Sequence, residues 1–218
     1  MGSRRRFAGL SAAPRPADNA AMQDPATAAI AAYLDQSREA LAAACADAAF
    51  LATCARIVDR LVACLEGGGK VLLAGNGGSA GDAQHIAGEF LCRLNYDRAP
   101  IAAVALTTDS STLTAIGNDY GYEHVFSRQV LGLGRDGDAL IAISTSGRSP
   151  NVLRAVEAAR QRRMAVIGFT GRSGGDMAAL CDLCLRAPAD STPLVQQLHI
   201  TAAHIICGLV EARLFPRG

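Results

Sequence analysis

Five short apolar runs, separated by stretches of helical periodicity, constrain this chain more than any other feature. They lie at residues 70–75, 101–106, 138–144, 164–170 and 182–187. Runs without polar alternation, spaced by helical stretches of about 12–15 residues, predict parallel strands buried on both faces. We therefore predict an α/β fold, a doubly wound five-stranded parallel sheet with helices on both sides. Ligands of such sheets bind at the carboxyl ends of the strands.

A helical segment is predicted ahead of the first strand. Asp24 followed by Pro25 is typical of a helix start, and two amphipathic helices are expected over 26–66. Their many Ala and Leu positions indicate an interface between subunits. Residues 1–24 lack a periodic apolar pattern, so we expect a disordered extension in front of a single domain at 25–218.

Charge and composition exclude several functions. The 218 residues include 21 Lys plus Arg and 20 Asp plus Glu, and a net charge of +1 gives no case for a nucleic acid or an anionic membrane as partner. Lys70 is the only lysine and precedes a strand, which excludes a Walker A loop and a Schiff-base enzyme. Seven cysteines without framework spacing, and no segment that resembles a signal peptide or a membrane span, favour the cytoplasm.

The stretch LLAGNGGSAGDAQHIAGE, residues 72–89, passes from an apolar run through glycines into a predicted helix. Its glycines and Ala80 match the dinucleotide-binding pattern G-x-G-x-x-A, but the acid expected about 20 residues later is misplaced, since Asp109 lies 29 residues after Ala80. A nicotinamide site and a turn without a ligand both stay open as alternatives. Ser79 and Asp82 match a capping box at the start of this helix.

A loop rich in hydroxyl groups follows the third apolar run. The sequence ISTSGRSPN places Ser144, Thr145, Ser146 and Ser149 around one glycine, and Ser149 with Pro150 reads as the start of a helix. A helix N-terminus with free N–H groups and hydroxyls nearby binds anions, and phosphate is its natural occupant. Because the loop has no lysine, we expect it to hold a phosphate group without transferring it.

Four motifs together carry a resemblance to a known family. AGNGGSAGDAQH, TAIGNDYG, ISTSGRSPN and GFTGRSGGDM, in this order, resemble the sugar-isomerase (SIS) domain family and, within it, the phosphoheptose isomerases, over about residues 27–215. The resemblance implies a flavodoxin-like SIS fold and an aldose–ketose isomerase that converts sedoheptulose 7-phosphate to D-glycero-D-manno-heptose 7-phosphate through an enediol. It also implies a cytoplasmic homotetramer that carries one zinc ion per subunit and catalyses the first step of ADP-heptose and lipopolysaccharide core biosynthesis.

Two predicted helices carry candidate metal ligands. His85 and Glu89 are four residues apart and share one helix face, although such a pair by itself is more often a surface hydrogen bond. Gln196 and His204 lie eight residues apart on the last helix, whereas His199 points elsewhere and is expected in packing or at an interface. The resemblance assigns His85, Glu89, Gln196 and His204 as the zinc ligands.

The resemblance also distributes the roles in the reaction. Glu89 is expected as the base at carbon and His204 as its acid–base partner, and the two roles could be exchanged. The substrate-binding positions carried over are Asn76, Gly77, Gly78, Ser79, Glu89, Arg93, Asn118, Asp119, Ser144, Thr145, Ser146, Ser149 and Gln196. The chain departs from the family at Gln197, where relatives usually have Glu, and at Ser191, where Asp is common.

Two members of the wider family offer rival functions. A non-catalytic SIS scaffold that binds the replication initiator protein lacks the acid and the histidine at the positions of Glu89 and His204, and this chain has both. A sugar-phosphate-sensing regulator would normally add a DNA-binding domain, and residues 26–66 show no basic recognition face. The isomerase is therefore favoured.

Overall fold

The structure, a computed structural model, describes residues 24–217. Except for its last residue, the predicted disordered extension 1–24 lies outside the described residues. The chain divides into two compact units after Arg38, within helix α2 (Pro25–Ala46). The extent of one domain at 25–218 stays a prediction, and the sheet and all candidate site residues belong to the second unit.

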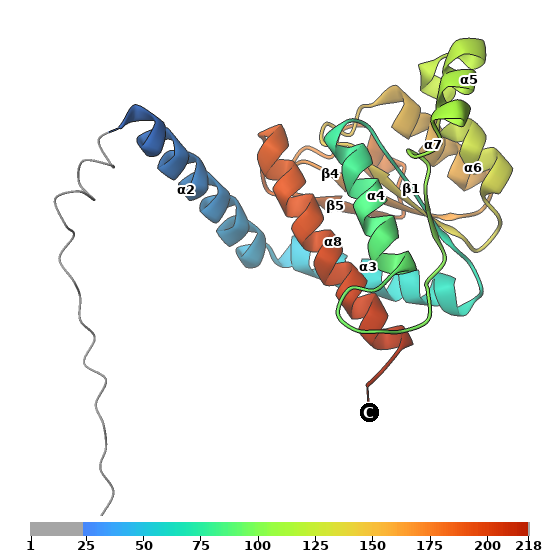
Figure 1. Ribbon diagram of the computed structural model, residues 1–218, viewed down its shortest axis with the longest axis horizontal. Helices are drawn as coiled ribbons and strands as arrows, with labels where there is room; N and C mark the ends of the chain where they lie inside the picture. Colours follow the sequence, from blue (N-terminus) through green and yellow to red (C-terminus); the bar gives the residue numbers. More distant parts are fainter. Residues whose placement is uncertain (1–23, 218) are drawn as a thin grey trace, which may run out of the picture. The chain divides into compact units, whose positions relative to one another are not determined.

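The second unit is built on a five-stranded parallel sheet (Figure 1). Its strands are β1 (Val71–Gly75), β2 (Ala103–Ala105), β3 (Ala139–Ile143), β4 (Ala165–Thr170) and β5 (Leu183–Arg186). The strand order is β2-β1-β3-β4-β5, and Leu73 on β1 is in register with Ala105 on β2 and Ile141 on β3. This order is the flavodoxin-like doubly wound arrangement. The predicted fold class and all five predicted strands are confirmed.

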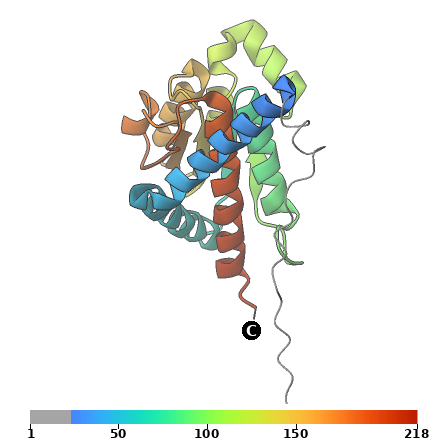
Figure 2. The ribbon, with the colours of Figure 1, turned by 90° about the vertical axis from the view of Figure 1, so that its left-hand side faces the viewer.

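Helices cover both faces of the sheet. The helices of this unit, besides the end of α2, are α3 (Ala48–Glu66), α4 (Gly78–Leu91), α5 (Ser110–Tyr120), α6 (Ser127–Leu133), α7 (Pro150–Gln161) and α8 (Thr192–Leu214), with 3₁₀ turns η1 (Tyr122–His124) and η2 (Met177–Ala179). Successive strand residues point to opposite faces, so Ile141 packs with α3, α4 and α8 while Leu140 and Ala142 pack with α6 and α7. Helices α4 and α8 lie side by side on one face (Figures 1 and 2).

Helix α8 has the length and mean hydropathy of a membrane span, although no such segment was expected from the sequence. Within this unit, however, Ala202, Ile206 and Val210 are buried in the core that α8 shares with α3 and α4. Burial accounts for part of its apolar composition, because a helix packed against two others and a sheet needs more than one apolar stripe, whereas Ile205 and Leu209 on the same helix are exposed.

The start of α4 differs from the predicted capping box. Gly77 is the N-cap residue, at a φ of +55° that residues with a Cβ rarely adopt, and the helix begins at Gly78. Ser79 is therefore not the N-cap residue, and it is only 3% exposed. The backbone of Ser79 packs so closely on Gly75 that a Cβ on Gly75 would lie 2.6 Å from the carbonyl oxygen of Ser79. The bare Cα atoms of Gly75 and Gly77 let the chain turn sharply from β1 into the helix.

Candidate functional site

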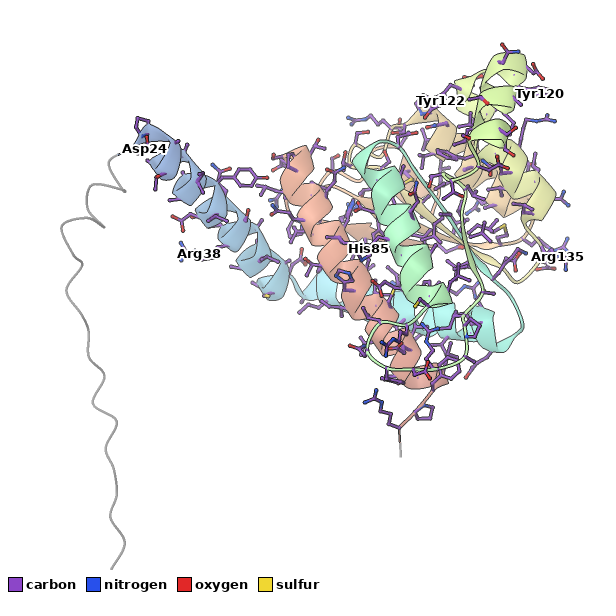
Figure 3. The ribbon with its side chains drawn as sticks, viewed as in Figure 1. Asp24, Arg38, His85, Tyr120, Tyr122 and Arg135 are labelled. Carbon is purple, nitrogen blue, oxygen red and sulfur yellow. The ribbon has the colours of Figure 1, made fainter. Side chains whose placement is uncertain are left out.

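The turn after β1 is tied to the start of α7 at the carboxyl edge of the sheet. Asn76 and Asn151 exchange two hydrogen bonds, each Nδ2 donating to the other's Oδ1 at 2.8 Å. The hydroxyl of Tyr122 donates to Oδ1 of Asn76 at 3.3 Å, and Figure 3 shows Tyr122 beside the end of α5. Asn76 is thus held in one orientation next to the glycines that follow it.

The hydroxyl groups predicted to hold phosphate do gather around the start of α7. Ser144 is 4% exposed, and its Oγ lies 3.0 Å from Oγ of Ser149 and 3.5 Å from Oγ of Ser146. Ser149 is the N-cap and Pro150 the first helical residue, as predicted, but the Ser149 side chain makes no capping hydrogen bond. Pro150 has no N–H, and the N–H groups of Val152 and Leu153 donate to the carbonyl of Ser149, so within the described residues the N–H of Asn151 is the one without a backbone acceptor in this first turn.

The loop after β4 closes over this hydroxyl loop. The N–H of Gly171 donates to the carbonyl of Thr145 at 2.9 Å, and Gly147, at a φ of +64°, lies so close to Gly174 that a Cβ would strike its backbone. The two loops border a pocket of about 180 Å³ whose lining includes Thr145, Ser146, Arg148, Arg172, Ser173 and Thr192. The pocket joins hydroxyl groups to Arg148 and to Arg172, and Arg172 pairs with Asp190, which also lines the pocket, at 3.2 Å.

Three of the four predicted metal ligands converge between α4 and α8. Nε2 of His85 lies 3.1 Å from Oε1 of Glu89 and 2.9 Å from Nε2 of His204, and the candidate ligand atoms of all three lie within 4.8 Å of one another. Figure 3 shows the His85 side chain between the two helices. His85 and Glu89 on α4 thus form a cluster with His204 on α8. An isolated surface hydrogen bond between His85 and Glu89 would not require a third residue from another helix.

The cluster fits a zinc ion in its chemistry. Two imidazole nitrogens and one carboxylate oxygen are donor types that zinc takes, and three such ligands leave a position open for substrate or water. Gln196, the fourth predicted ligand, lies on the same helix as His204 with its amide packed against Gly78, where a Cβ would be 3.0 Å from Cδ. Its side chain therefore reaches the glycine turn from α8.

His199 is buried inside the domain, which fits the packing role expected for it rather than a role at an interface. It is 1% exposed, its ring packs at 5.6 Å from that of Phe169, and its Nε2 lies 3.0 Å from the carbonyl of Thr170 at the end of β4. Burial lowers the pKa of His199 to about 4, against an ordinary value of 6.5. The ring is therefore neutral at pH 7 and donates Nε2–H to Thr170, which fixes α8 to the sheet.

Three predicted substrate ligands do not join this arrangement. Asn118 and Asp119 are exposed near the end of α5, a helix without a buried residue, and Asn118 Nδ2 donates to Oδ1 of Asp119 at 2.8 Å. Arg93 is exposed just beyond α4, and its side chain forms no hydrogen bond or ion pair with the described residues. Their predicted roles stay predictions.

Further buried polar residues near these elements were not expected from the sequence. Asn151 is 3% exposed, and a polar residue on the apolar face of α7 was the signal that could have revealed it. Arg98 and Glu211 form an ion pair with side chains 3% and 0% exposed, and no sequence motif links them. Asp82 carries a buried Oδ2 without a partner among the described residues, and burial raises its pKa.

The doubly wound sheet, the hydroxyl-rich loop at its carboxyl edge and the His/Glu cluster between α4 and α8 can be compared with known families. The sequence profile of the SIS domain family matches residues 28–171.

Curated relatives narrow the assignment. The chain is 56% identical to the phosphoheptose isomerase of Burkholderia pseudomallei (strain K96243) over 180 residues, which cover 83% of this chain and 91% of the relative. It is 48% identical to that of Aneurinibacillus thermoaerophilus over 186 residues, with coverage of 85% and 94%. The solved phosphoheptose isomerase of Neisseria gonorrhoeae superimposes with a TM-score of 0.79 at 45% identity, over 84% of this chain and 97% of that one. The chain belongs to the phosphoheptose isomerase family of SIS-domain proteins.

Proposed function

We propose that the protein interconverts sedoheptulose 7-phosphate and D-glycero-D-manno-heptose 7-phosphate as an aldose–ketose isomerase. One observation carries the proposal: Glu89 and His204 come from two helices, yet their candidate acid–base atoms lie within 4.8 Å of each other. Membership of a family of isomerases supports the same activity.

The hydroxyl loop would hold the phosphate end of the sugar. Ser144, Ser146 and Ser149 supply hydroxyl groups beside the start of α7, whose Asn151 N–H and positive dipole end favour an anion. Asn76 and the two glycines after it lie between this loop and α4, where they would contact sugar hydroxyls. Binding of the phosphate end then places the carbonyl end toward α4 and α8.

The proton transfer needs one group at carbon and one at oxygen. In our proposal Glu89 removes a proton from C1 of the ketose while His204 protonates the carbonyl oxygen at C2, which gives the 1,2-enediol. Return of the carbon proton to C2 and loss of the O1 hydroxyl proton then give the aldehyde at C1, so no other reactant is required. The roles of Glu89 and His204 could also be exchanged.

A zinc ion is proposed at His85, Glu89, His204 and Gln196, at one ion per subunit. When bound, zinc would supply a positive charge that polarises the sugar oxygens. His85 acts only as a ligand in this proposal, whereas Glu89 and His204 also contact the reacting atoms. Gln196 would serve both the metal and the substrate, since its amide already reaches the glycine turn.

The non-catalytic scaffold is disfavoured by the same residues. A scaffold has no need of an acid and a histidine whose side chains converge from two helices, and Glu89 is partly buried in the cluster with only 19% of its side chain exposed. The relatives matched at 48% to 59% identity are named as isomerases.

The direct test is incubation of the purified protein with sedoheptulose 7-phosphate. We expect an aldose heptose phosphate to appear, together with exchange of solvent deuterium into the substrate, because the enediol route exposes the carbon proton to water. No aldose product and no exchange, in the presence of added zinc, would overturn the proposed activity.

We further propose a cytoplasmic homotetramer that acts in heptose synthesis for lipopolysaccharide. Within the described residues, Leu41 and Leu51 are 41% and 51% exposed, and Ile205 and Leu209 on α8 are 51% and 47% exposed. Apolar side chains of this size on neighbouring positions are typical of surfaces that other subunits cover. Light scattering should give a mass near four times 22.5 kDa, and a monomer at micromolar concentration would contradict it.

A further inference from the structure

The last turn of α4, which carries Glu89, is closed by a side chain from outside the helix. The final carbonyl groups of a helix have no N–H partners within it. Gly88 O accepts the N–H of Cys92 at 2.8 Å, but Glu89 O accepts Nη2 of Arg98 at 2.7 Å, and Phe90 O accepts Nη1 of Arg98 at 2.6 Å. Within the described residues no backbone N–H donates to Glu89 O. One guanidinium group therefore holds the main chain at Glu89.

Arg98 is itself fixed by a buried carboxylate. Its Nε donates to Oε1 of Glu211 at 3.2 Å, and the N–H groups of Leu94 and Asn95 donate to the same carboxylate at 3.0 and 2.9 Å. The side chains of Arg98 and Glu211 are 3% and 0% exposed. Charges buried to this extent persist only when they are paired and hydrogen-bonded, as both are here.

Glu211 lies on the helix that carries His204. Seven residues, about two helical turns, separate them, so both side chains project from the same face of α8. Buried Cys207 lies on this face between them. The Arg98–Glu211 pair thus joins the end of the Glu89 helix to the His204 helix. Any slip of α4 along α8 would break its hydrogen bonds.

We infer that Arg98 and Glu211 are positioning residues for the proton transfer, acting through the main chain of Glu89 and through the α8 face that carries His204. The inference rests on the proposed isomerase function, because it assigns a catalytic consequence to the pair. A pair needed only for stability could be replaced by well-packed apolar side chains without loss of turnover.

The test replaces both charges at once, with Arg98→Met/Glu211→Leu. Replacing both residues avoids an uncompensated charge. It also removes the hydrogen-bond partners of the N–H groups of Leu94 and Asn95 and of the carbonyl of Glu89, so we expect a folded but less stable protein. We expect a folded protein whose kcat falls about 10- to 100-fold, the range for residues that orient catalytic groups from behind. The KM for the sugar phosphate should be unchanged, because the hydroxyl loop is untouched. Arg213→Met is the matched control, since Arg213 on α8 pairs with Asp59 at the surface, and it should keep the parental kcat.

A second variant, Arg98→Lys, keeps the charge opposite Glu211 but loses the planar fork that reaches two carbonyl groups. We expect it to fold and to show the same selective loss of kcat. Either variant, folded and with the parental kcat, would overturn the inference, and so would failure of both to fold, because the pair would then act through stability alone. A parental protein without isomerase activity would instead overturn the proposed function, and this inference with it.

Discussion

His85 and His204 are 119 residues apart in the chain, yet their Nε2 atoms lie 2.9 Å apart across the seam between α4 and α8. Their rings meet edge to face, with centroids 5.0 Å apart. Glu89 completes the cluster from the next turn of α4. The candidate chemistry of this protein therefore depends on how two helices pack.

Glu89→Gln should bind the sugar phosphate but fail to turn it over. The amide keeps the size and the hydrogen-bonding capacity of the side chain but cannot accept a carbon-bound proton, so we expect a loss of about 100-fold or more in kcat. Solvent-deuterium exchange into the substrate is the measurement, and binding is checked separately by calorimetry. A variant that exchanges and isomerises at the parental rate would remove Glu89 from the mechanism.

His85→Ala should separate metal binding from proton transfer. We expect weaker binding of zinc, because one of the converging nitrogen ligands is lost, with measurable isomerisation when zinc is resupplied. Elemental analysis after dialysis gives the metal content of parent and variant. Equal zinc content in both would show that His85 is not a ligand.

Ser146→Ala and Ser149→Ala should each raise the KM for the phosphorylated sugar about tenfold, because each removes a hydrogen bond to a charged group in ground and transition states alike. Steady-state kinetics measures the change, and kcat should stay near the parental value. Thr53→Ala is a suitable control, since its exposed hydroxyl only bonds the carbonyl of Ala49 within α3. Parental KM values in both serine variants would place the phosphate elsewhere.

Gly78→Ala should impair activity while the protein stays folded. Its Cβ would meet the end of the Gln196 side chain. Because this side chain can move aside, we expect the substitution to displace the Gln196 amide rather than to unfold the protein. We expect kcat/KM to fall about 10- to 100-fold, the order that a displacement near 1 Å produces at a reacting centre.

Gly81→Ala, three residues further along α4, is the control. A Cβ there meets nothing within 4 Å, and alanine favours a helix by up to about 1 kcal/mol over glycine. We expect parental activity with equal or higher thermal stability. Equal activity in both alanine variants would show that the position of Gln196 is unimportant.

His199 should make the fold sensitive to mild acid. Its pKa is lowered to about 4 by burial, against 6.5 when unfolded, so between these values the unfolded chain binds more protons and stability falls as the pH falls. The expected loss from pH 7 to pH 5 is roughly 2 kcal/mol. Urea unfolding at the two pH values measures it, and His199→Gln, which still offers an N–H to Thr170 but does not titrate, should lose most of the difference. An unchanged pH dependence in that variant would exclude His199 as its source.

The sequence by itself determined the five strands of the sheet and the start of helix α7. Each of the five apolar runs became a parallel strand. The strands β1, β3 and β4 are buried at every position, as the sequence predicted, whereas Val104 on the edge strand β2 and Arg186 on the edge strand β5 are exposed because no further strand or helix covers them. The start of α7 at Ser149 and Pro150 was equally local, since a proline fixes the first helical φ and lacks only an N–H that the helix does not need. Among the turns, the Ser79 cap was wrong because Gly75 and Gly77 permit an earlier and tighter entry into α4.

Only the tertiary structure decided which of the candidate residues meet. Sequence spacing placed His85 and Glu89 on one helix face but could not show that His204 lies opposite, because the packing of α4 against α8 depends on the whole core beneath them. Asn151 stood out as a polar residue on an apolar helix face, but its pairing with Asn76, like that of Arg98 with Glu211, could not be predicted for the same reason. Periodicity along a chain records which face of an element is buried, whereas the partner across that face is chosen by the packing of side chains distant in sequence.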